Sequence, residues 1–232
     1  MLTRAIGVVL SVLTLGPSLG ASEIAGTIKI QRRLTKRRVT SGADLYQRGV
    51  AVELGSDKEQ DALAFERSHV VIYLEGHLPS EKITAELNQQ DRRFSPDLVV
   101  VPVGSSVSFA NLDPIFHNVF SFSKAKSFDL GNYPKDQTRI GTFSKAGIVL
   151  VDCHLHPNMS AVIVVTPNRW GTKADPSGRF VLPGVPGTYT LVAWHRAAGF
   201  FRKTVRATEA AGVSLDFIIP LDADGVVEQA KR

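Results

Sequence analysis

The stretch KAGIVLVDCHLHPNMSAVIVVT, residues 145–166, sets two apolar runs on either side of a short polar loop. β-Branched residues are frequent in both runs, so each run is predicted to be a strand. The loop carries the only cysteine of the chain, Cys153, followed closely by His154, His156 and Met159. A strand on each side would hold these side chains rigidly at one end of a sheet.

Similar strand patterns extend outward from this stretch in both directions. Residues 69–76, 98–102 and 115–122 are rich in Val, Ile and Phe, and a Gly-Ser-Ser turn at 104–106 separates two apolar runs. The 232 residues include 19 glycines and 12 prolines, with 44% hydrophobic residues. This composition predicts an all-β protein with many turns and a packed core.

The first twenty residues, MLTRAIGVVLSVLTLGPSLG, have the pattern of a cleaved secretory signal. Arg4 precedes an apolar run at 5–15, and Pro17 and small residues follow it. A membrane anchor is the alternative, but the run is shorter than the ~20 residues that cross a bilayer. We therefore expect a periplasmic or secreted protein whose net charge falls from +5 to +4 when Arg4 is removed.

Export makes a single thiol unusual. Oxidising compartments favour disulfides, and one cysteine cannot form a disulfide within its own chain. Cys153 is therefore buried and inert, paired between chains, or bound to a ligand.

The residues near Cys153 suit a metal. A thiolate and two imidazoles form a trigonal copper site, which a weak axial thioether completes. Cys153, His156 and Met159 follow the spacing Cys-x-x-His-x-x-Met, and Pro157 stiffens the turn. The second imidazole must come from elsewhere, and His117 in the strand IFHNVFSF is the best candidate.

A histidine on one strand and Cys…His…Met on a later loop resemble the cupredoxin family of small blue copper proteins, especially the amicyanins with their short ligand loop. The resemblance is firmest over residues 94–166. It implies a Greek-key β-sandwich with type 1 copper that carries single electrons between redox proteins. His117 would be the buried ligand, Cys153 the coupling ligand, His156 the electron exit and Met159 the axial ligand. NLDPIFHNVFS resembles the segment of the first histidine, where Asn118 would tie the two ligand segments together.

Several alternatives stay open at this stage. His154 stands where the relatives usually have Ser or Thr, and it could replace His156 as a ligand. Zinc could occupy the same residues, and a nucleophilic Cys-His pair is the enzymatic alternative. The protein could also deliver copper without electron transfer, or it could be an interaction module in which the metal only stabilises the fold.

The C-terminal segment ADPSGRFVLPGVPGTYTLVAWH, residues 174–195, resembles the carboxypeptidase regulatory-like (transthyretin-like) sandwich. This resemblance extends over 167–222 and implies a folding or interaction module. The expected divisions are a signal peptide at 1–20, a cupredoxin-like domain at 21–166 with a charged insertion at 31–68, a smaller β-sandwich at 167–222, and a tail at 223–232.

The distribution of charge indicates which partners to expect, and the remaining histidines indicate which classes of copper enzyme to exclude. The basic stretch QRRLTKRRVT, residues 31–40, is either a solvated loop or a steering patch for an acidic redox partner. Nucleic acid is not expected, because no aromatic platform is interleaved with the charges. His69, His77 and His195 show no motif of a multicopper oxidase or nitrite reductase, so they are expected to be structural or exposed, and the protein is not expected to be an enzyme.

Overall fold

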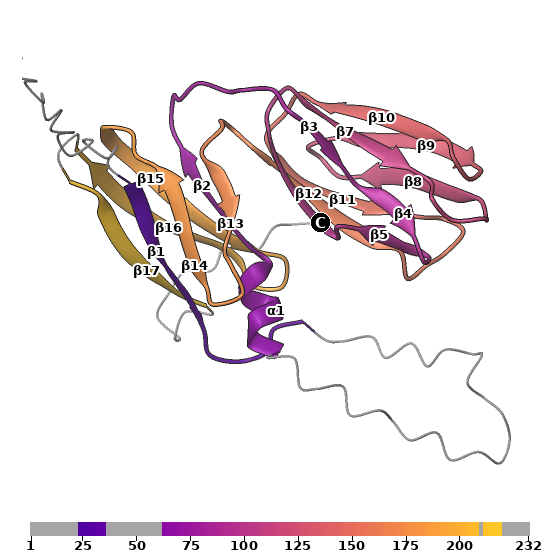
Figure 1. The fold of residues 1–232 in the computed structure, drawn as a ribbon. Coiled ribbons are helices and arrows are strands. Elements are labelled where there is room, and N and C mark those ends of the chain that lie inside the picture. Colours follow the sequence, from indigo (N-terminus) through magenta and orange to yellow (C-terminus); the bar gives the residue numbers. More distant parts are fainter. Residues whose placement is uncertain (1–22, 36–61, 209–210, 220–232) are drawn as a thin grey trace, which may run out of the picture.

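The computed structural model describes residues 23–35, 62–208 and 211–219. Two β-sandwiches lie next to each other, with a short helix, α1 (Ala62–Ser68), beside the first (Figure 1). This architecture confirms the predicted all-β class. In the described ranges no helix has the length and apolar character needed to cross a membrane.

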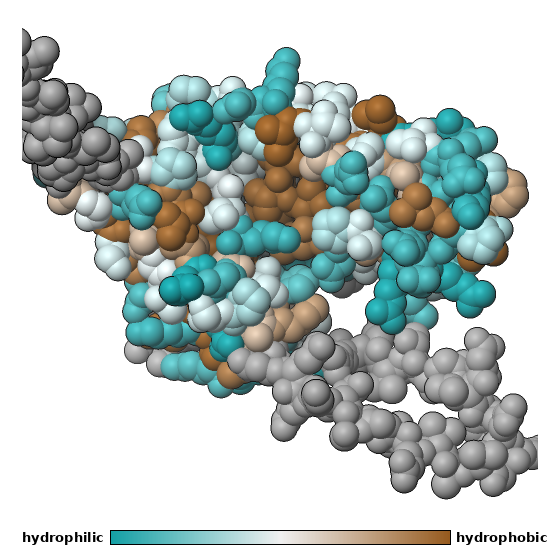
Figure 2. Space-filling view, in the orientation of Figure 1, coloured by the Kyte–Doolittle hydropathy of each residue, from teal (hydrophilic) through white to brown (hydrophobic). Residues whose placement is uncertain are grey.

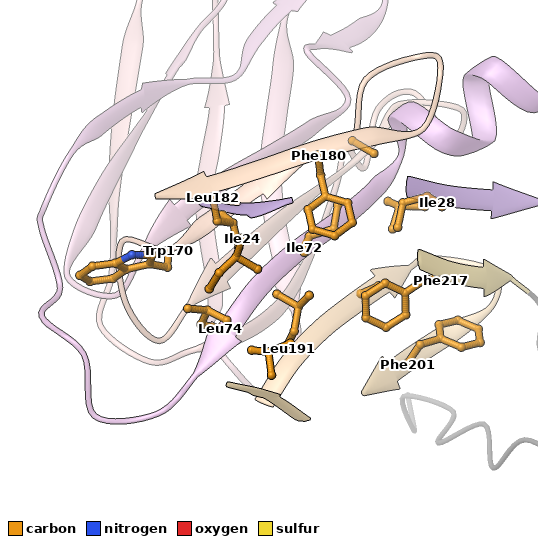
Figure 3. Close-up of a cluster of buried hydrophobic side chains, with 14 of the residues drawn as sticks. Ile24, Ile28, Ile72, Leu74, Trp170, Phe180, Leu182, Leu191, Phe201 and Phe217 are labelled. Carbon is orange, nitrogen blue, oxygen red and sulfur yellow. The ribbon is translucent and has the colours of Figure 1, made fainter. Parts of the chain in front are cut away.

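The first sandwich packs the sheet β14-β1-β17 against the sheet β13-β2-β15-β16. Its strands are β1 (Glu23–Ile30), β2 (Val70–Glu75), β13 (Gly171–Lys173), β14 (Arg179–Pro183), β15 (Gly187–His195), β16 (Gly199–Ala207) and β17 (Val213–Ile219). Aliphatic and aromatic side chains of both sheets, including Ile72, Leu191 and Phe217, fill the space between them (Figure 3). Gly26 lets β1 lie close to β17, since a Cβ there would be 1.7 Å from the Leu215 carbonyl oxygen.

The strand pairing corrects the expected boundary at residue 166. That boundary groups β1 and β2 with the cupredoxin-like domain, but β1 pairs with β14 and β17, and β2 pairs with β13 and β15. The N-terminal and C-terminal strands therefore complete one sandwich, and the second sandwich lies between them in the chain. Local strand patterns carry no information about which distant strand becomes the partner, so the sequence could not show this.

The second sandwich is formed by the strands between β2 and β13. Its sheets have the orders β6-β12-β11-β8-β9 and β10-β7-β3, with a separate hairpin β4-β5. The strands are β3 (Thr84–Glu86), β4 (Asn88–Gln90), β5 (Arg93–Ser95), β6 (Leu98–Pro102), β7 (Ser105–Ala110), β8 (His117–Phe122), β9 (Ser127–Tyr133), β10 (Thr138–Phe143), β11 (Gly147–Asp152) and β12 (Ser160–Thr166).

Some strands are apolar on both faces because a third hydrophobic cluster joins the sandwiches. On β12, Ile163 faces the core of the second sandwich, whereas Val162 and Val164 pack with Val192 and Trp194 of β15. Alternate residues of a strand point to opposite faces, so a strand between two cores needs an unbroken apolar run. Figure 2 shows a hydrophobic area in the middle of the molecule, near the junction of the two sandwiches.

Three of the expected segments lie wholly or largely outside the described residues. These are the signal peptide at 1–20, the tail at 223–232 and most of the charged insertion, since 36–61 is not described. The described end of the insertion, residues 62–68, forms the helix α1.

Candidate metal centre

The candidate ligand loop connects two neighbouring strands. β11 and β12 pair antiparallel, with Asp152 opposite Ser160, so residues 153–159 form the connection. Within it the Met159 N–H donates to the His156 carbonyl at 2.9 Å, which closes the loop into a tight turn.

Two sulfur-bearing residues of the loop are buried in the core of the second sandwich. Cys153 is 4% exposed and Met159 is 1% exposed, and both belong to the cluster that contains Val149 and Val151. Cys153, directly after β11, therefore lies on the same buried side as the valines of that strand. The thioether is thus held in the same apolar environment as the thiol.

β8 brings the distant histidine to this loop. It begins at His117 and pairs with β11, with Phe120 opposite Asp152. The His117 Nδ1 lies 3.0 Å from the His156 Nδ1, and the Cys153 Sγ lies 3.8 Å from that same atom. All three ligand atoms lie within 4.8 Å of one another.

These separations suit one shared metal ion. A thiolate binds at about 2.3 Å and an imidazole at about 2.0 Å, so on one metal a sulfur and a ring nitrogen lie at most about 4.3 Å apart, and two ring nitrogens at most about 4.0 Å. The separations of 3.8 Å and 3.0 Å are within these limits. Two imidazoles and a thiolate suit copper or zinc, and a thioether is a ligand that copper accepts more readily than zinc. The donor set therefore fits a metal, and Met159 favours copper if its sulfur reaches the ion.

Asp113 fixes the orientation of His117, the buried candidate ligand. The His117 Nε2 lies 2.7 Å from the Asp113 Oδ2, and since a carboxylate only accepts, Nε2 carries the proton. The lone pair of His117 is then on Nδ1, which faces Cys153 and His156. Burial works to raise the pKa of Asp113, but hydrogen bonds from the Arg92 N–H, His117 and the Asp91 N–H outweigh it and lower the pKa. Asp113 thus stays a carboxylate.

His156 completes the set from a less buried position. Burial is the largest cause that lowers the pKa of His156; the neighbouring His117 and Arg92 lower it further and outweigh Asp113, which raises it. A lowered pKa keeps the imidazole neutral near neutral pH, and a neutral imidazole is the form that binds a metal.

Asn118 ties the two ligand segments together, which confirms its expected role. Its backbone N–H donates to the Cys153 Sγ at 3.4 Å, and its Oδ1 accepts the His154 N–H at 3.4 Å. Its Nδ2 donates to the Asp129 Oδ1 at 2.7 Å, which fixes the amide orientation. An N–H bond to a sulfur stabilises the thiolate form that a metal requires.

His154 lies apart from the cluster of ligand atoms. Its ring stacks on Phe120, with centroids 3.6 Å apart and an interplanar angle of 4°, and its side chain is 49% exposed. The structure therefore brings together His156, rather than His154, with His117 and Cys153.

The other described histidines have structural contacts or are exposed, as expected. The His69 Nε2 lies 3.1 Å from an Asp97 oxygen, and the His195 Nε2 lies 3.0 Å from the Glu66 Oε2. His77 is exposed.

Sequence reasoning missed Asp113 and Asp129, the two carboxylates behind the site. The signal for Asp113 was its position four residues before His117, in the turn Asp-Pro that precedes β8. Asp129 had no such signal, because it reaches Asn118 from the neighbouring strand β9.

Comparisons with known proteins give likenesses to part of the chain. No family model matches, and no curated protein matches. Among solved structures, the copper-containing nitrite reductase of Thermus scotoductus SA-01 is 22% identical over 40% of this chain and 24% of its own, with a TM-score of 0.35. A purple cupredoxin from Nitrosopumilus maritimus is 21% identical over 35% of this chain and 99% of its own, with a TM-score of 0.32. The reduced Cu(I) form of a mutant amicyanin is 20% identical over 41% of this chain and 98% of its own, with a TM-score of 0.34.

These structural neighbours are cupredoxins or contain copper, but the TM-scores are too low to transfer a function. The aligned region is about a quarter of the length of the nitrite reductase chain. The fold and the site define an all-β protein of two sandwiches, with a His-Cys-His cluster at one end of the second.

Proposed function

We propose that this chain is an exported type 1 copper protein that carries single electrons between redox partners. The observation that carries the proposal is the cluster of His117 Nδ1, Cys153 Sγ and His156 Nδ1 within 4.8 Å at one end of a rigid sandwich. When bound, copper would alternate between Cu(II) and Cu(I), accepting one electron from a donor and passing it to an acceptor.

Each side chain has a distinct part in this proposal. His117 is held by Asp113, and the Cys153 sulfur is held by the Asn118 N–H, so neither can move far when the charge of the site changes. Met159, buried in the same core, would offer a thioether to the metal. His156, the least buried of the three clustered residues, offers the shortest way to the surface.

In this proposal the protein is a carrier and not an enzyme. The signal-like residues 1–20 support export, and the partner is another redox protein.

A copper titration tests the proposal. One equivalent of Cu(II) added to the mature chain is expected to produce an intense thiolate-to-copper absorption band and a narrow EPR hyperfine splitting. Cys153→Ser is expected to abolish the band, whereas the control His77→Ala is expected to keep it. A pale, ordinary copper spectrum in the wild type would contradict the type 1 assignment. Rapid loss of Cu(I) to a chelator would instead favour copper delivery.

A further inference from the structure

The turn between β4 and β5 is attached to the back of the candidate metal centre. Its residues Asp91 and Arg92 have positive φ angles of 54° and 55°. Their backbone N–H groups donate to the two oxygens of Asp113 at 2.7 and 2.8 Å. The same carboxylate accepts the proton of His117, so one side chain fixes both the turn and the ligand.

This attachment brings positive charge to the site. Arg92 and Arg93 are both exposed, and the Arg92 backbone N–H lies 2.8 Å from an oxygen of Asp113, the carboxylate that also holds His117. Asp91 on the same turn offsets one of the two positive charges, so the turn is positive overall. In Figure 2 hydrophilic side chains surround the end of the molecule where Figure 1 places the β4-β5 hairpin.

Exposed apolar side chains flank the same site residues. Leu112 precedes Asp113, Phe116 precedes His117 and Leu155 precedes His156 in the chain; their exposed fractions are 43%, 55% and 45%. Large apolar side chains with a charged rim are typical of protein docking surfaces.

We propose that Arg92 and Arg93, together with Leu112, Phe116 and Leu155, form the docking surface for a redox protein whose own docking face is acidic. The inference rests on the proposed function and adds the residues and the charge of the partner. Carboxylates of the partner would pair with the two arginines, and its apolar centre would cover the three apolar side chains. One electron would pass from the partner's reduced centre to Cu(II) near His156, with no proton or bond transferred.

The sequence also suggested a basic patch at 31–40, but its described part lies elsewhere. Arg32 and Arg33 follow β1 in the first sandwich, next to Leu34 and Thr35, which bind Glu66 of α1. The β4-β5 hairpin, which carries Arg92 and Arg93, is instead linked to His117 through the Asp91 and Arg92 backbone N–H groups and Asp113. Of these described arginines, Arg92 and Arg93 are therefore the ones placed to guide a partner to the metal.

Charge reversal tests the docking surface. The variant Arg92→Glu/Arg93→Glu is compared with Lys124→Glu/Lys145→Glu, which makes the same charge change at two exposed residues. Lys124 follows β8 and Lys145 precedes β11, so both lie about 20 Å along the strands from the ligand end. Arg92→Gln/Arg93→Gln serves as a milder variant, because it removes the charges without placing a carboxylate near Asp113.

The probe is cytochrome b5, a haem protein with carboxylates around its exposed haem edge. Reduced cytochrome b5 is expected to reduce the Cu(II) protein at a rate that falls with rising salt. The Glu double variant is expected to react about tenfold more slowly at low salt and the control less than twofold more slowly. Equal rates for the wild type and both arginine variants, or an equal loss in the lysine control, would overturn the inference.

A binding measurement without copper separates this inference from the proposed function. Cytochrome b5 added to the metal-free protein is expected to shift the NMR amide signals of Arg92, Arg93, Phe116 and Leu155, and the arginine variants are expected to lose these shifts. Shifts confined to other surfaces, or no binding, would overturn the docking surface. If the wild type lacks the blue copper spectrum but shows this footprint, the proposed function fails and the docking surface stands.

Discussion

Asp113 shows how one buried carboxylate organises the candidate metal centre. It is 6% exposed and accepts three hydrogen bonds, one from His117 and two from the β4-β5 turn. A hydrogen-bonded carboxylate behind a metal-binding histidine fixes the tautomer and ring orientation of that ligand. The geometry of the site therefore depends on a residue that cannot touch the metal while it makes these bonds.

Asp113→Ala is expected to weaken copper binding about 10–100-fold, because His117 loses the partner that orients it. It should also lower the free energy of unfolding of the metal-free protein by about 1–3 kcal/mol, since buried donors lose their acceptor. Competition with a chelator and urea unfolding measure the two effects. Glu86→Ala, an exposed carboxylate on β3, is the control and should change neither; unchanged copper affinity in Asp113→Ala would contradict the role of Asp113.

Among the secondary-structure elements, α1 fastens the ends of two strands of the first sandwich. Glu66 accepts the N–H groups of Leu34 and Thr35, which follow β1, at 3.0 and 2.7 Å. It also accepts the proton of His195, the last residue of β15. Both side chains of this pair are 1% exposed, so their hydrogen bonds are protected from water.

Glu66→Gln is expected to destabilise the protein by about 1–3 kcal/mol. The glutamine amide has one oxygen and one NH₂ group, so one of the groups that donate to Glu66 would lose its acceptor. Urea unfolding of the metal-free protein measures the loss. The exposed Glu81→Gln is the control and should stay within about 0.5 kcal/mol of the wild type. A Glu66→Gln protein as stable as this control would show that the contacts of α1 contribute little.

The same pair predicts a loss of stability in acid. Burial lowers the pKa of His195, so below about pH 6.5 the unfolded chain binds a proton that the folded protein resists. The contribution of His195 is therefore present above that pH and decreases as the pH falls toward the folded pKa. Hydrogen bonds from Thr35 and Leu34 outweigh the burial that would raise the pKa of Glu66, so its contribution is lost at still lower pH.

The measurement is the free energy of unfolding of metal-free protein between pH 7.5 and pH 5.5. The wild type is expected to lose more stability over this interval than His195→Gln does. The raised pKa of His69 acts in the opposite direction, and it is common to both proteins. Identical slopes in the two proteins would contradict the assignment.

The two sandwiches are held together by a hydrophobic cluster between them. Val71 and Trp194 from the first sandwich pack with Leu98, Val162 and Val164 from the second, and none of them is more than 4% exposed. Burial of this kind couples the folding of two sandwiches that would otherwise resemble separate domains.

Trp194→Ala is therefore expected to cost about 3–5 kcal/mol and to lower the stability of both sandwiches together. Two signals follow the unfolding. Tryptophan fluorescence reports on the first sandwich, because Trp170 lies in its core and remains in the variant. The copper band reports on the second sandwich. The two signals should give the same midpoint in the wild type. Phe122→Ala, at an aromatic residue that is 80% exposed, is the control and should change little; separate midpoints in the wild type would contradict the coupling.

The all-β class, the strands on each side of the loop at 153–159 and the residues that meet at the site could all be predicted from the amino-acid sequence. These features depend on local physics, because alternation, β-branching and turn residues act over a few positions. The spacing of Cys153 and His156 in one loop is also local, whereas His117 was chosen because a trigonal copper site needs a second imidazole.

The strands that complete each sandwich and the side chains that support the site were visible only in the folded molecule. β1 pairs with β17 across nearly the whole chain, and no local pattern specifies such a partner. Asp113 and Arg92 became part of the site because the β4-β5 turn folds against the residues before β8. Contacts between distant segments form only when the packed cores bring them together, so they appear in the structure and not in the sequence.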